Sequence, residues 1–127
     1  MDKLYKPLVI CGPSGVGKTV LAKHLMKTTT FKDLLQFSVS STTRAPRANE
    51  THGKDYHFVT KEEFDREIEK GKFLEFNHVH GNYYGTHIEA VNHIRETQKR
   101  ICLLDIDVQG ALNVIDYRQL QCNFVFI

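Results

Sequence analysis

The clearest chemical signal in the sequence is a glycine-rich segment near the N-terminus, Gly12-Pro-Ser-Gly-Val-Gly-Lys18-Thr19. It matches the G-x-x-x-x-G-K-[ST] pattern of phosphate-binding loops without a gap. The glycines let successive backbone N–H groups turn inward around phosphate oxygens, and the N-terminus of a following helix adds partial positive charge. Lys18 can neutralise the β- and γ-phosphates, while the Thr19 hydroxyl can meet Mg²⁺ directly or through water. The predicted phosphate-binding residues are Gly12, Pro13, Ser14, Gly15, Val16, Gly17, Lys18 and Thr19.

Two acids, Asp105 and Asp107, follow the apolar run at residues 101–104. Ligands of α/β sheets gather at the carboxyl ends of the strands, where P-loop proteins also carry an acid that orients magnesium. We therefore predict Asp105 and Thr19 to be the metal-binding residues, either directly or through water. A simple role as strand-end caps remains the alternative for both Asp105 and Asp107.

Two arginines, Arg44 and Arg47, flank a proline turn in a polar stretch. An enzyme that joins two phosphorylated substrates needs a second cationic pocket besides the phosphate loop. Guanidinium groups bind phosphate in bidentate fashion, so this pair suits a monophosphate better than two flexible lysines would. A solvated loop that happens to contain two arginines is the alternative interpretation.

The elements that must position these residues follow from the apolar pattern. Residues 8–11 form an unbroken apolar run typical of a buried parallel strand, and apolar residues one turn apart predict a helix from Lys18 until the threonines at 28–30. Further strands are expected at 37–43, 56–59, 73–80, 101–104 and 124–127, the fourth and fifth of them being of the buried type. Thr60 and Glu63 form a capping-box signal for a helix that ends at Gly71, and another helix is expected around residues 88–94.

Composition restricts the possible partners. Lys and Arg number 17 against 15 Asp and Glu, and a net charge of +2 is too small to indicate a nucleic-acid or membrane partner. The three cysteines, with no C-x-x-C pair, are interpreted as reduced core residues. With no signal-peptide pattern or stretch of transmembrane length, we expect a cytoplasmic protein; its oligomeric state is not predicted.

Several blocks resemble guanylate kinases. They are Ser38-Val-Ser-Ser-Thr-Thr-Arg44-Ala-Pro-Arg47, Gly53-Lys-Asp-Tyr56-His-Phe, Gly81-Asn-Tyr-Tyr84-Gly85 and Leu104-Asp-Ile-Asp-Val-Gln-Gly110, in the family's order after the phosphate loop. The resemblance implies an α/β fold with a P-loop parallel sheet core flanked by helices, residues 1–38 and 89–127, and an inserted mixed α+β GMP-binding subdomain, residues 39–88. It also implies that the family's lid and last core segment are missing, so that the fold is C-terminally truncated.

The resemblance further implies which residues bind the acceptor nucleotide. Those matching the family's GMP-phosphate ligands are Arg44, Arg47, Tyr56 and Tyr84, and those matching the guanine-facing positions are Ser40, Glu75, Thr86 and Asp107. A carboxylate such as Glu75 can accept hydrogen bonds from guanine donors that adenine lacks.

The implied reaction, part of purine nucleotide metabolism, is transfer of the ATP γ-phosphate to GMP, with Mg²⁺ as cofactor, Lys18, Arg44 and Arg47 as catalytic residues, and a subdomain that closes over the substrates.

Other functions compete with this one. Scaffold proteins contain guanylate-kinase-like domains that bind phosphorylated peptides, but these typically have a degraded phosphate loop, unlike the intact Gly17-Lys18-Thr19 here. A truncated fragment that binds GMP and ATP with little turnover is a second alternative. A GTPase would need an N-K-x-D motif, which the sequence lacks, and a metal site at His78 and His80 lacks a third ligand at suitable spacing.

Overall fold

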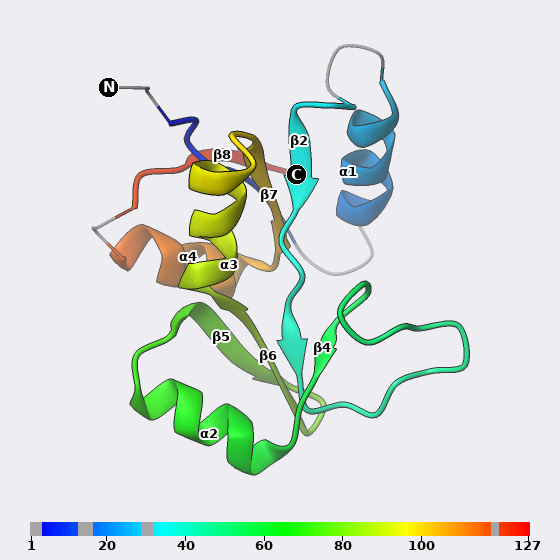
Figure 1. The fold of residues 1–127 in the computed structure, drawn as a ribbon, viewed down its shortest axis with the longest axis vertical. Helices are drawn as coiled ribbons and strands as arrows, with labels where there is room; N and C mark the ends of the chain where they lie inside the picture. The colour runs from blue at the N-terminus through cyan, green and yellow to red at the C-terminus, as the bar shows by residue number, and fades with distance from the viewer. Residues whose placement is uncertain (1–3, 13–16, 29–31, 118–119) are drawn as a thin grey trace.

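The computed structural model describes residues 4–12, 17–28, 32–117 and 120–127. In this part of the chain the strands form two four-stranded sheets, which we call the parallel sheet and the mixed sheet. The parallel sheet and most helices occupy the upper half of Figure 1, and the mixed sheet the lower half. Residues 38–40 carry the chain from the first sheet to the second, and β6 leads back towards the first.

The parallel sheet has the order β2 (Leu35–Phe37), β7 (Ile101–Ile106), β1 (Leu8–Cys11) and β8 (Asn123–Phe126). All three pairings are parallel, with Val9 opposite Leu104 and Ile10 opposite Asp105 in β1 and β7. This register brings Gly12, which follows β1, to the same edge as the acids that follow residue 104. The predicted runs of buried residues at 8–11 and 101–104 are confirmed as central strands.

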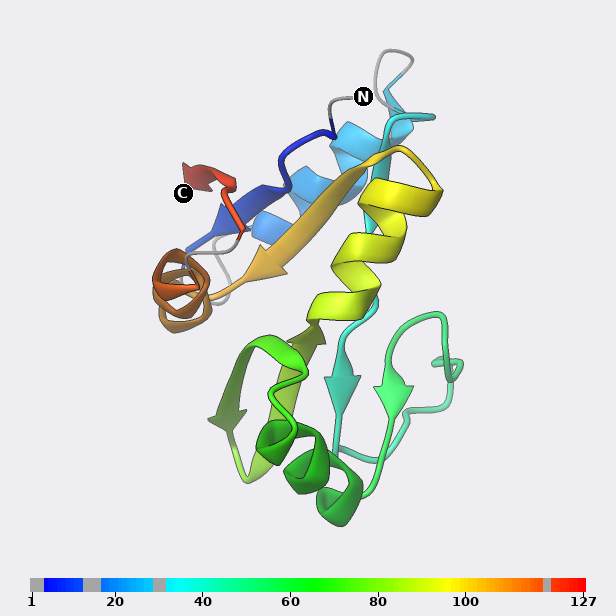
Figure 2. The ribbon, with the colours of Figure 1, turned by 60° about the vertical axis from the view of Figure 1, so that its left-hand side comes forward.

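Helices cover both faces of the parallel sheet, as the turned view in Figure 2 shows. Helix α1 (Lys18–Lys27) packs Ala22, Leu25 and Met26 against Ile10 and Leu103 on one face. On the other face lie α3 (Ile88–Asn92), its π-helical continuation η1 (His93–Thr97) and α4 (Val108–Asp116). Side chains alternate along a strand, so Val9, Cys11 and Leu104 meet this second group of helices.

The mixed sheet has the order β4 (His57–Phe58), β3 (Ser41–Thr42), β6 (Asn82–His87) and β5 (Phe73–Val79). Its long hairpin turns at His80 and Gly81, both with positive φ, the geometry that matches the twist of paired strands. Helix α2 (Lys61–Glu69) begins at Thr60, whose hydroxyl accepts the Glu63 N–H at 3.1 Å, so the predicted cap is confirmed. Phe64 of α2 stacks on Phe73 with ring centroids 4.4 Å apart.

Several sequence expectations were wrong in detail. The strand expected at 37–43 is two short strands in different sheets, because the chain crosses between sheets at 38–40. Leu21, expected in the apolar stripe of the first helix, is 37% exposed. The last strand, expected to be buried, is an edge strand with Phe126 64% exposed, and His80 lies in the hairpin turn. Helix α4 was not predicted.

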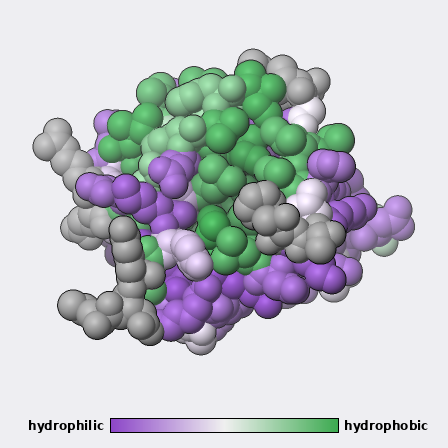
Figure 3. All heavy atoms as spheres, turned by 90° about the horizontal axis from the view of Figure 1, so that it is seen from above, coloured by the Kyte–Doolittle hydropathy of each residue, from purple (hydrophilic) through white to green (hydrophobic). Residues whose placement is uncertain are grey.

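The surface carries exposed apolar residues, and two cysteines lie in the interior. Figure 3 shows apolar residues gathered over one part of the upper face, and the exposed apolar residues include Val125, Phe126 and Ile127 at the β8 edge. Cys11 and Cys102 are buried free thiols, and burial raises the pKa of Cys102 to about 12, which fits inert core residues. Within the described ranges, no helix is long and apolar enough to cross a membrane.

Candidate active site

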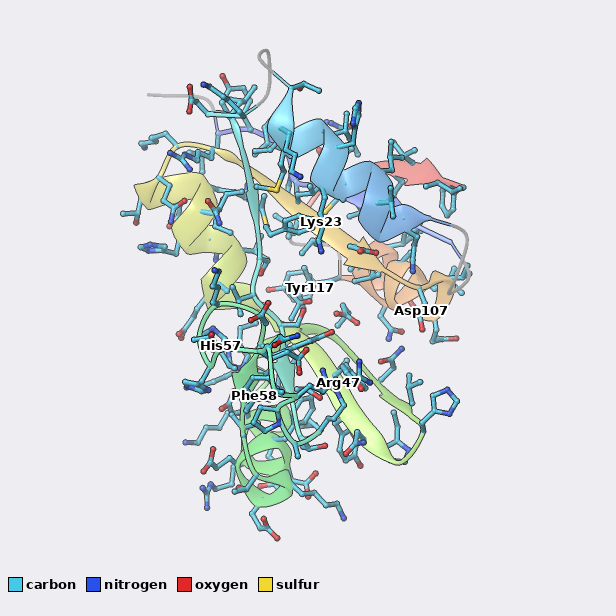
Figure 4. All side chains as sticks on the ribbon, turned by 90° about the vertical axis from the view of Figure 1, so that its right-hand side faces the viewer. Lys23, Arg47, His57, Phe58, Asp107 and Tyr117 are labelled. Atoms are coloured by element: carbon cyan, nitrogen blue, oxygen red, sulfur yellow. The ribbon has the colours of Figure 1, made fainter. Side chains whose placement is uncertain are left out.

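A pocket of about 220 Å³ lies where the two sheets meet. It combines residues from the carboxyl edge of the parallel sheet with residues from one face of the mixed sheet, and Figure 4 shows Asp107 of the first part and Arg47 of the second. Seven predicted site residues line it: Lys18, Ser40, Tyr56, Glu75, Tyr84, Asp105 and Asp107. Thr86 lines an adjoining pocket together with Ser40, Tyr56 and Asp105.

The predicted phosphate side is described in part. Gly17 adopts a left-handed φ of 94° immediately before α1, the conformation for which glycine is suited, and Gly12 is buried after β1. Lys18 Nζ lies 3.7 Å from Asp105 Oδ1, so the two predicted phosphate and metal residues are neighbours across β1 and β7. Pro13, Ser14, Gly15, Val16 and the Thr19 side chain lie outside the described residues.

Glu75 is the most perturbed acid of the pocket. It is 7% exposed, and Thr86 Oγ1 donates a hydrogen bond to its Oε1 at 2.7 Å. Burial raises the pKa of Glu75 to about 7, the Asp107 charge adds to the rise, and the Thr86 hydrogen bond opposes it. Gly110 approaches so closely that a methyl group there would lie 3.0 Å from Glu75 Oε2. The carboxyl group is therefore held in one place and titrates near neutral pH.

Asp107 has a structural role as well as a place in the pocket. It is the N-cap of α4, with Oδ1 accepting the Gly110 N–H at 2.8 Å. The sequence analysis had offered a cap at the strand end as the alternative role, whereas the side chain caps the helix that follows. Its Oδ2 accepts from Asn77 Nδ2, also at 2.8 Å. Capping does not exclude ligand binding, because each carboxylate oxygen keeps a second lone pair.

Arg44 lies at the outer side of the site, in contact with two pocket tyrosines. Its guanidinium carbon is 5.3 Å from the centroid of the Tyr56 ring, and the Tyr84 side chain is near enough to contribute to the raised pKa of Arg44. Glu50 accepts from Nη1 and Nη2 of Arg44 at 2.9 and 3.0 Å. These contacts raise the pKa of Arg44, that with Glu50 most of all, so this cation is permanent.

Arg47 is placed differently from Arg44. It is exposed, and its backbone is tied to Glu50: the Arg47 N–H donates to Glu50 Oε1 at 2.9 Å, and the Arg47 carbonyl accepts the Glu50 N–H at 3.0 Å. The structure thus assembles Arg44, Tyr56 and Tyr84 as a unit and leaves the Arg47 side chain on the loop beside it.

The sequence analysis missed Glu50 and Asn77. Glu50 follows the arginines in the same polar loop, so an acid close to two predicted phosphate ligands was the available signal. Asn77 follows Glu75 by two residues on β5, and residues at that spacing face the same side of a strand. Among the described residues, no group of three His, Cys, Asp or Glu side chains that could hold a metal ion includes His78 or His80.

The fold and this pocket define an α/β protein of the P-loop kinase class, with the pocket at the carboxyl edge of a parallel sheet. The sequence pattern of the guanylate kinase family matches residues 4–127, so the chain belongs to the guanylate kinase family.

Individual relatives agree with this assignment. Guanylate kinase 1 of Oryza sativa subsp. japonica is 53% identical over 122 residues, which are 96% of this chain and 31% of the relative. The guanylate kinase of Schizosaccharomyces pombe is 52% identical over 109 residues, covering 86% of this chain and 52% of the relative. For the guanylate kinase of Sus scrofa the identity is 44%, over 96% of this chain and 60% of the relative.

A solved structure gives the same result for the fold. The crystal structure of guanylate kinase from Anaplasma phagocytophilum superposes with a TM-score of 0.75 at 31% identity, covering 98% of this chain and 60% of that chain. The expected fold class is confirmed. This chain therefore spans between about a third and three fifths of the length of these relatives.

Proposed function

We propose that the chain binds ATP and GMP and that it is the part of a guanylate kinase that brings the two nucleotides together for transfer of the γ-phosphate. The observation that carries the proposal is the single pocket lined by Lys18 and Asp105 on one side and by Glu75, Tyr84 and Asp107 on the other. The first group suits a nucleoside triphosphate and the second suits a purine monophosphate.

On the acceptor side, the mixed sheet and Asp107, which follows β7, supply base recognition. Guanine presents the N1–H and an exocyclic amine on one edge, and the carboxylates of Glu75 and Asp107 are the proposed acceptors. Adenine has an unprotonated N1 at the same place and would leave a carboxylate facing an acceptor. Ser40 and Thr86 provide hydroxyls for the remaining positions. This arrangement supports selectivity for guanine over adenine.

The acceptor phosphate would lie against Arg44, Arg47, Tyr56 and Tyr84. Arg44 gives a permanent charge, and the two tyrosines, with ring centroids 6.1 Å apart, can donate phenolic hydrogen bonds to phosphate oxygens. Arg47 would have to turn its exposed side chain towards the phosphate, which the loop position allows.

On the donor side, Lys18 would neutralise the β- and γ-phosphates of ATP. An oxygen of the GMP phosphate attacks the γ-phosphorus in line, a new P–O bond forms, the bond to the β-phosphate oxygen breaks, and ADP leaves. Lys18, Arg44 and Arg47 stabilise the charge on the equatorial oxygens, so positioning and electrostatics supply the catalysis.

Magnesium fits the donor side. Asp105 offers a carboxylate beside Lys18 at the pocket wall, and Mg²⁺ prefers oxygen ligands shared between one or two carboxylates, phosphates and water. Asp105 and Thr19 would hold it. When bound, it would supply charge neutralisation between the β- and γ-phosphates.

We further propose a division into a core, residues 1–38 and 89–127, and a GMP-binding insert, residues 39–88, that closes over the substrates. The separate sheets support it, since the parallel strands lie in the first ranges and the mixed strands in the second. Closure would exclude water from the γ-phosphate. Small-molecule substrates without a nucleic-acid or membrane partner, and a cytoplasmic location, stay predictions.

Calorimetry with GMP, and with AMP as the unmatched base, tests the proposal, together with GDP formation from ATP, GMP and Mg²⁺. Arg44→Ala should weaken GMP binding by about a hundredfold, because a charge-assisted phosphate contact is lost. Arg66→Ala on the exposed face of α2 is the matched control and should bind like the wild type.

The outcomes separate the alternatives. GMP-selective binding with GDP formation supports the kinase. GMP-selective binding without turnover assigns the chain a nucleotide-binding role alone, and equal binding of GMP and AMP refutes the proposal.

A further inference from the structure

Asn77 lies on β5 and lines the pocket beside the two carboxylates, although no sequence motif drew attention to it. Its Nδ2 donates to Asp107 Oδ2 at 2.8 Å. The other carboxylate oxygen, Oδ1, accepts the Gly110 N–H at the same distance. Each oxygen of Asp107 therefore has one donor, and the plane of the carboxylate is fixed from both sides.

The orientation of the Asn77 amide follows from its partner. A carboxylate accepts and cannot donate, so the amide NH₂ group, not its oxygen, must face Asp107. The bond also joins the two sheets, since Asn77 belongs to β5 and Asp107 directly follows β7. Glu75, two residues before Asn77 on the same strand, is held separately by Thr86. Of the three acids that line the pocket, Asp105 lies beside Lys18, whereas Glu75 and Asp107 are each oriented by neutral donors.

Guanine makes unequal demands on these two acids. One carboxylate can span a pair of adjacent parallel donors, the N1–H and the nearer hydrogen of the exocyclic amine, as it spans the two donors of a guanidinium. The second amine hydrogen points away from that pair and needs another acceptor. Asp107, at the start of α4, lines the same pocket and can supply that acceptor.

We propose that Asn77 is a positioning residue that holds Asp107 ready to accept from the exocyclic amine of a guanine base, and so sets the preference for GMP over a purine monophosphate without that amine. The inference deepens the proposed function and rests on it. Its specific consequence is that Asn77 matters for GMP but little for IMP, which keeps the N1–H and lacks the amine.

The test compares GMP and IMP affinities, measured by calorimetry, in the wild type and in Asn77→Ala. GMP should bind about tenfold more weakly to the variant, as expected when a hydrogen bond to a charged group loses its support. IMP should change by less than about twofold, within the scatter of a surface substitution. The GMP-to-IMP ratio therefore falls.

Asn113→Ala is the matched control. Asn113 also links the parallel-sheet part to β5, by a 3.4 Å bond from its Nδ2 to the Phe76 carbonyl, but it does not line the pocket. Its GMP-to-IMP ratio should equal that of the wild type. If Asn77→Ala weakens both ligands equally, or neither, Asn77 merely holds the two sheets together and the proposal is overturned.

Asn77→Asp keeps the shape of the side chain and guards against a folding defect in the alanine variant. It replaces the donor by a carboxylate opposite Asp107, so GMP should bind even more weakly, while thermal unfolding shows whether the fold is intact. An unchanged GMP-to-IMP ratio in a folded Asn77→Asp protein also overturns the proposal. Failure of the proposed function would look different, because the wild type itself would not prefer GMP to AMP.

Discussion

The Glu50 carboxylate accepts hydrogen bonds from both terminal nitrogens of Arg44, with Nη1–Oε1 and Nη2–Oε2 distances of 2.9 and 3.0 Å. Nη1 also donates to the Ala45 carbonyl at 3.0 Å. Neither the Glu50 carboxylate nor the Ala45 carbonyl accepts from Nε or from the second Nη2 hydrogen, which form the other edge of the guanidinium. Tyr84, which lines the pocket, also raises the pKa of Arg44, so Glu50 holds one edge of a cation that lies beside a pocket residue.

This relationship predicts that Glu50→Gln weakens GMP binding about five- to tenfold, because Arg44 loses the charge-assisted pair that orients it. Guanosine, which has no phosphate, should bind the variant and the wild type alike, and calorimetry with both ligands checks this. Tighter GMP binding by the variant would show instead that Glu50 competes with the phosphate for Arg44.

A second prediction concerns the pH dependence of GMP binding. The Glu75 pKa of about 7 means that the carboxyl group is protonated below neutral pH, while guanine donors need a carboxylate. GMP affinity should therefore rise with pH up to a plateau above pH 7, by about tenfold per pH unit well below the pKa. Calorimetry across this range provides the profile, and Glu75→Gln should remove the part of it centred near pH 7, leaving only the titration of the GMP phosphate itself at about pH 6.

Thr86→Val is an independent check on the same profile. Valine has nearly the same shape as threonine but cannot donate to Glu75 Oε1, and this hydrogen bond lowers the pKa of Glu75. The midpoint of the GMP profile should move to higher pH in this variant. A midpoint that stays in place, or moves to lower pH, would assign the pH dependence to another group.

Glu75 also predicts how stability changes with pH. The folded-state pKa is raised above the ordinary value of 4.5, so between pH 4.5 and 7 the unfolded chain loses this proton while the folded protein keeps it. The contribution of Glu75 to the free energy of unfolding therefore falls as pH rises through this window, by on the order of a few kcal/mol.

Urea denaturation of the wild type and Glu75→Gln at pH 4.5 and pH 8 measures this contribution. The variant should gain stability relative to the wild type at the higher pH, because glutamine has no charge to bury. A difference that is the same at both pH values would mean that the folded pKa of Glu75 is not raised.

Gly85 gives a steric prediction for the mixed sheet. A methyl group there would meet Phe73 Cδ1 and Cε1 at 2.8 Å and Phe64 Cζ at 3.0 Å, inside a stack of buried rings. Gly85→Ala should therefore lower the free energy of unfolding by roughly 1–3 kcal/mol, the usual cost of overpacking a core. Gly71→Ala, where the added methyl group would meet nothing within 4 Å, tests strain at a positive φ alone and should cost less.

Sequence reasoning predicted the strands and the fold class where the signal was local. Residues 8–11 and 101–104 are unbroken apolar runs that only a strand covered on both faces would need, and Thr60 with Glu63 is a complete capping signal. Helix α4 was not predicted, because Asp107 was interpreted only as a ligand or strand-end cap, whereas its side chain caps this helix.

The position of Asn77 could not have been derived in the same way. It acts through a partner brought close by the fold, because Asn77 on β5 and Asp107, which follows β7, are 30 residues apart. Glu50 lies only 6 residues from Arg44, but its pairing with Arg44 rather than Arg47 depends on the geometry of the loop. Within the described residues, β8 pairs with β1 alone and Phe126 is 64% exposed, so the apolar run at 124–127 is not buried within this chain.

The stack of Phe64, Phe73 and Tyr83 in the mixed sheet lies apart from the cluster around Val9 and Leu104 that fills the parallel sheet. Two such centres of burial predict two cooperative units of unfolding, connected by Leu74 of β5, which packs in the second cluster, and by the Asn77–Asp107 hydrogen bond. Amide hydrogens of α2 and β6 should exchange with deuterium through openings that leave β1 and β7 protected. GMP, bound between the two units, would slow exchange in both and make them open as one.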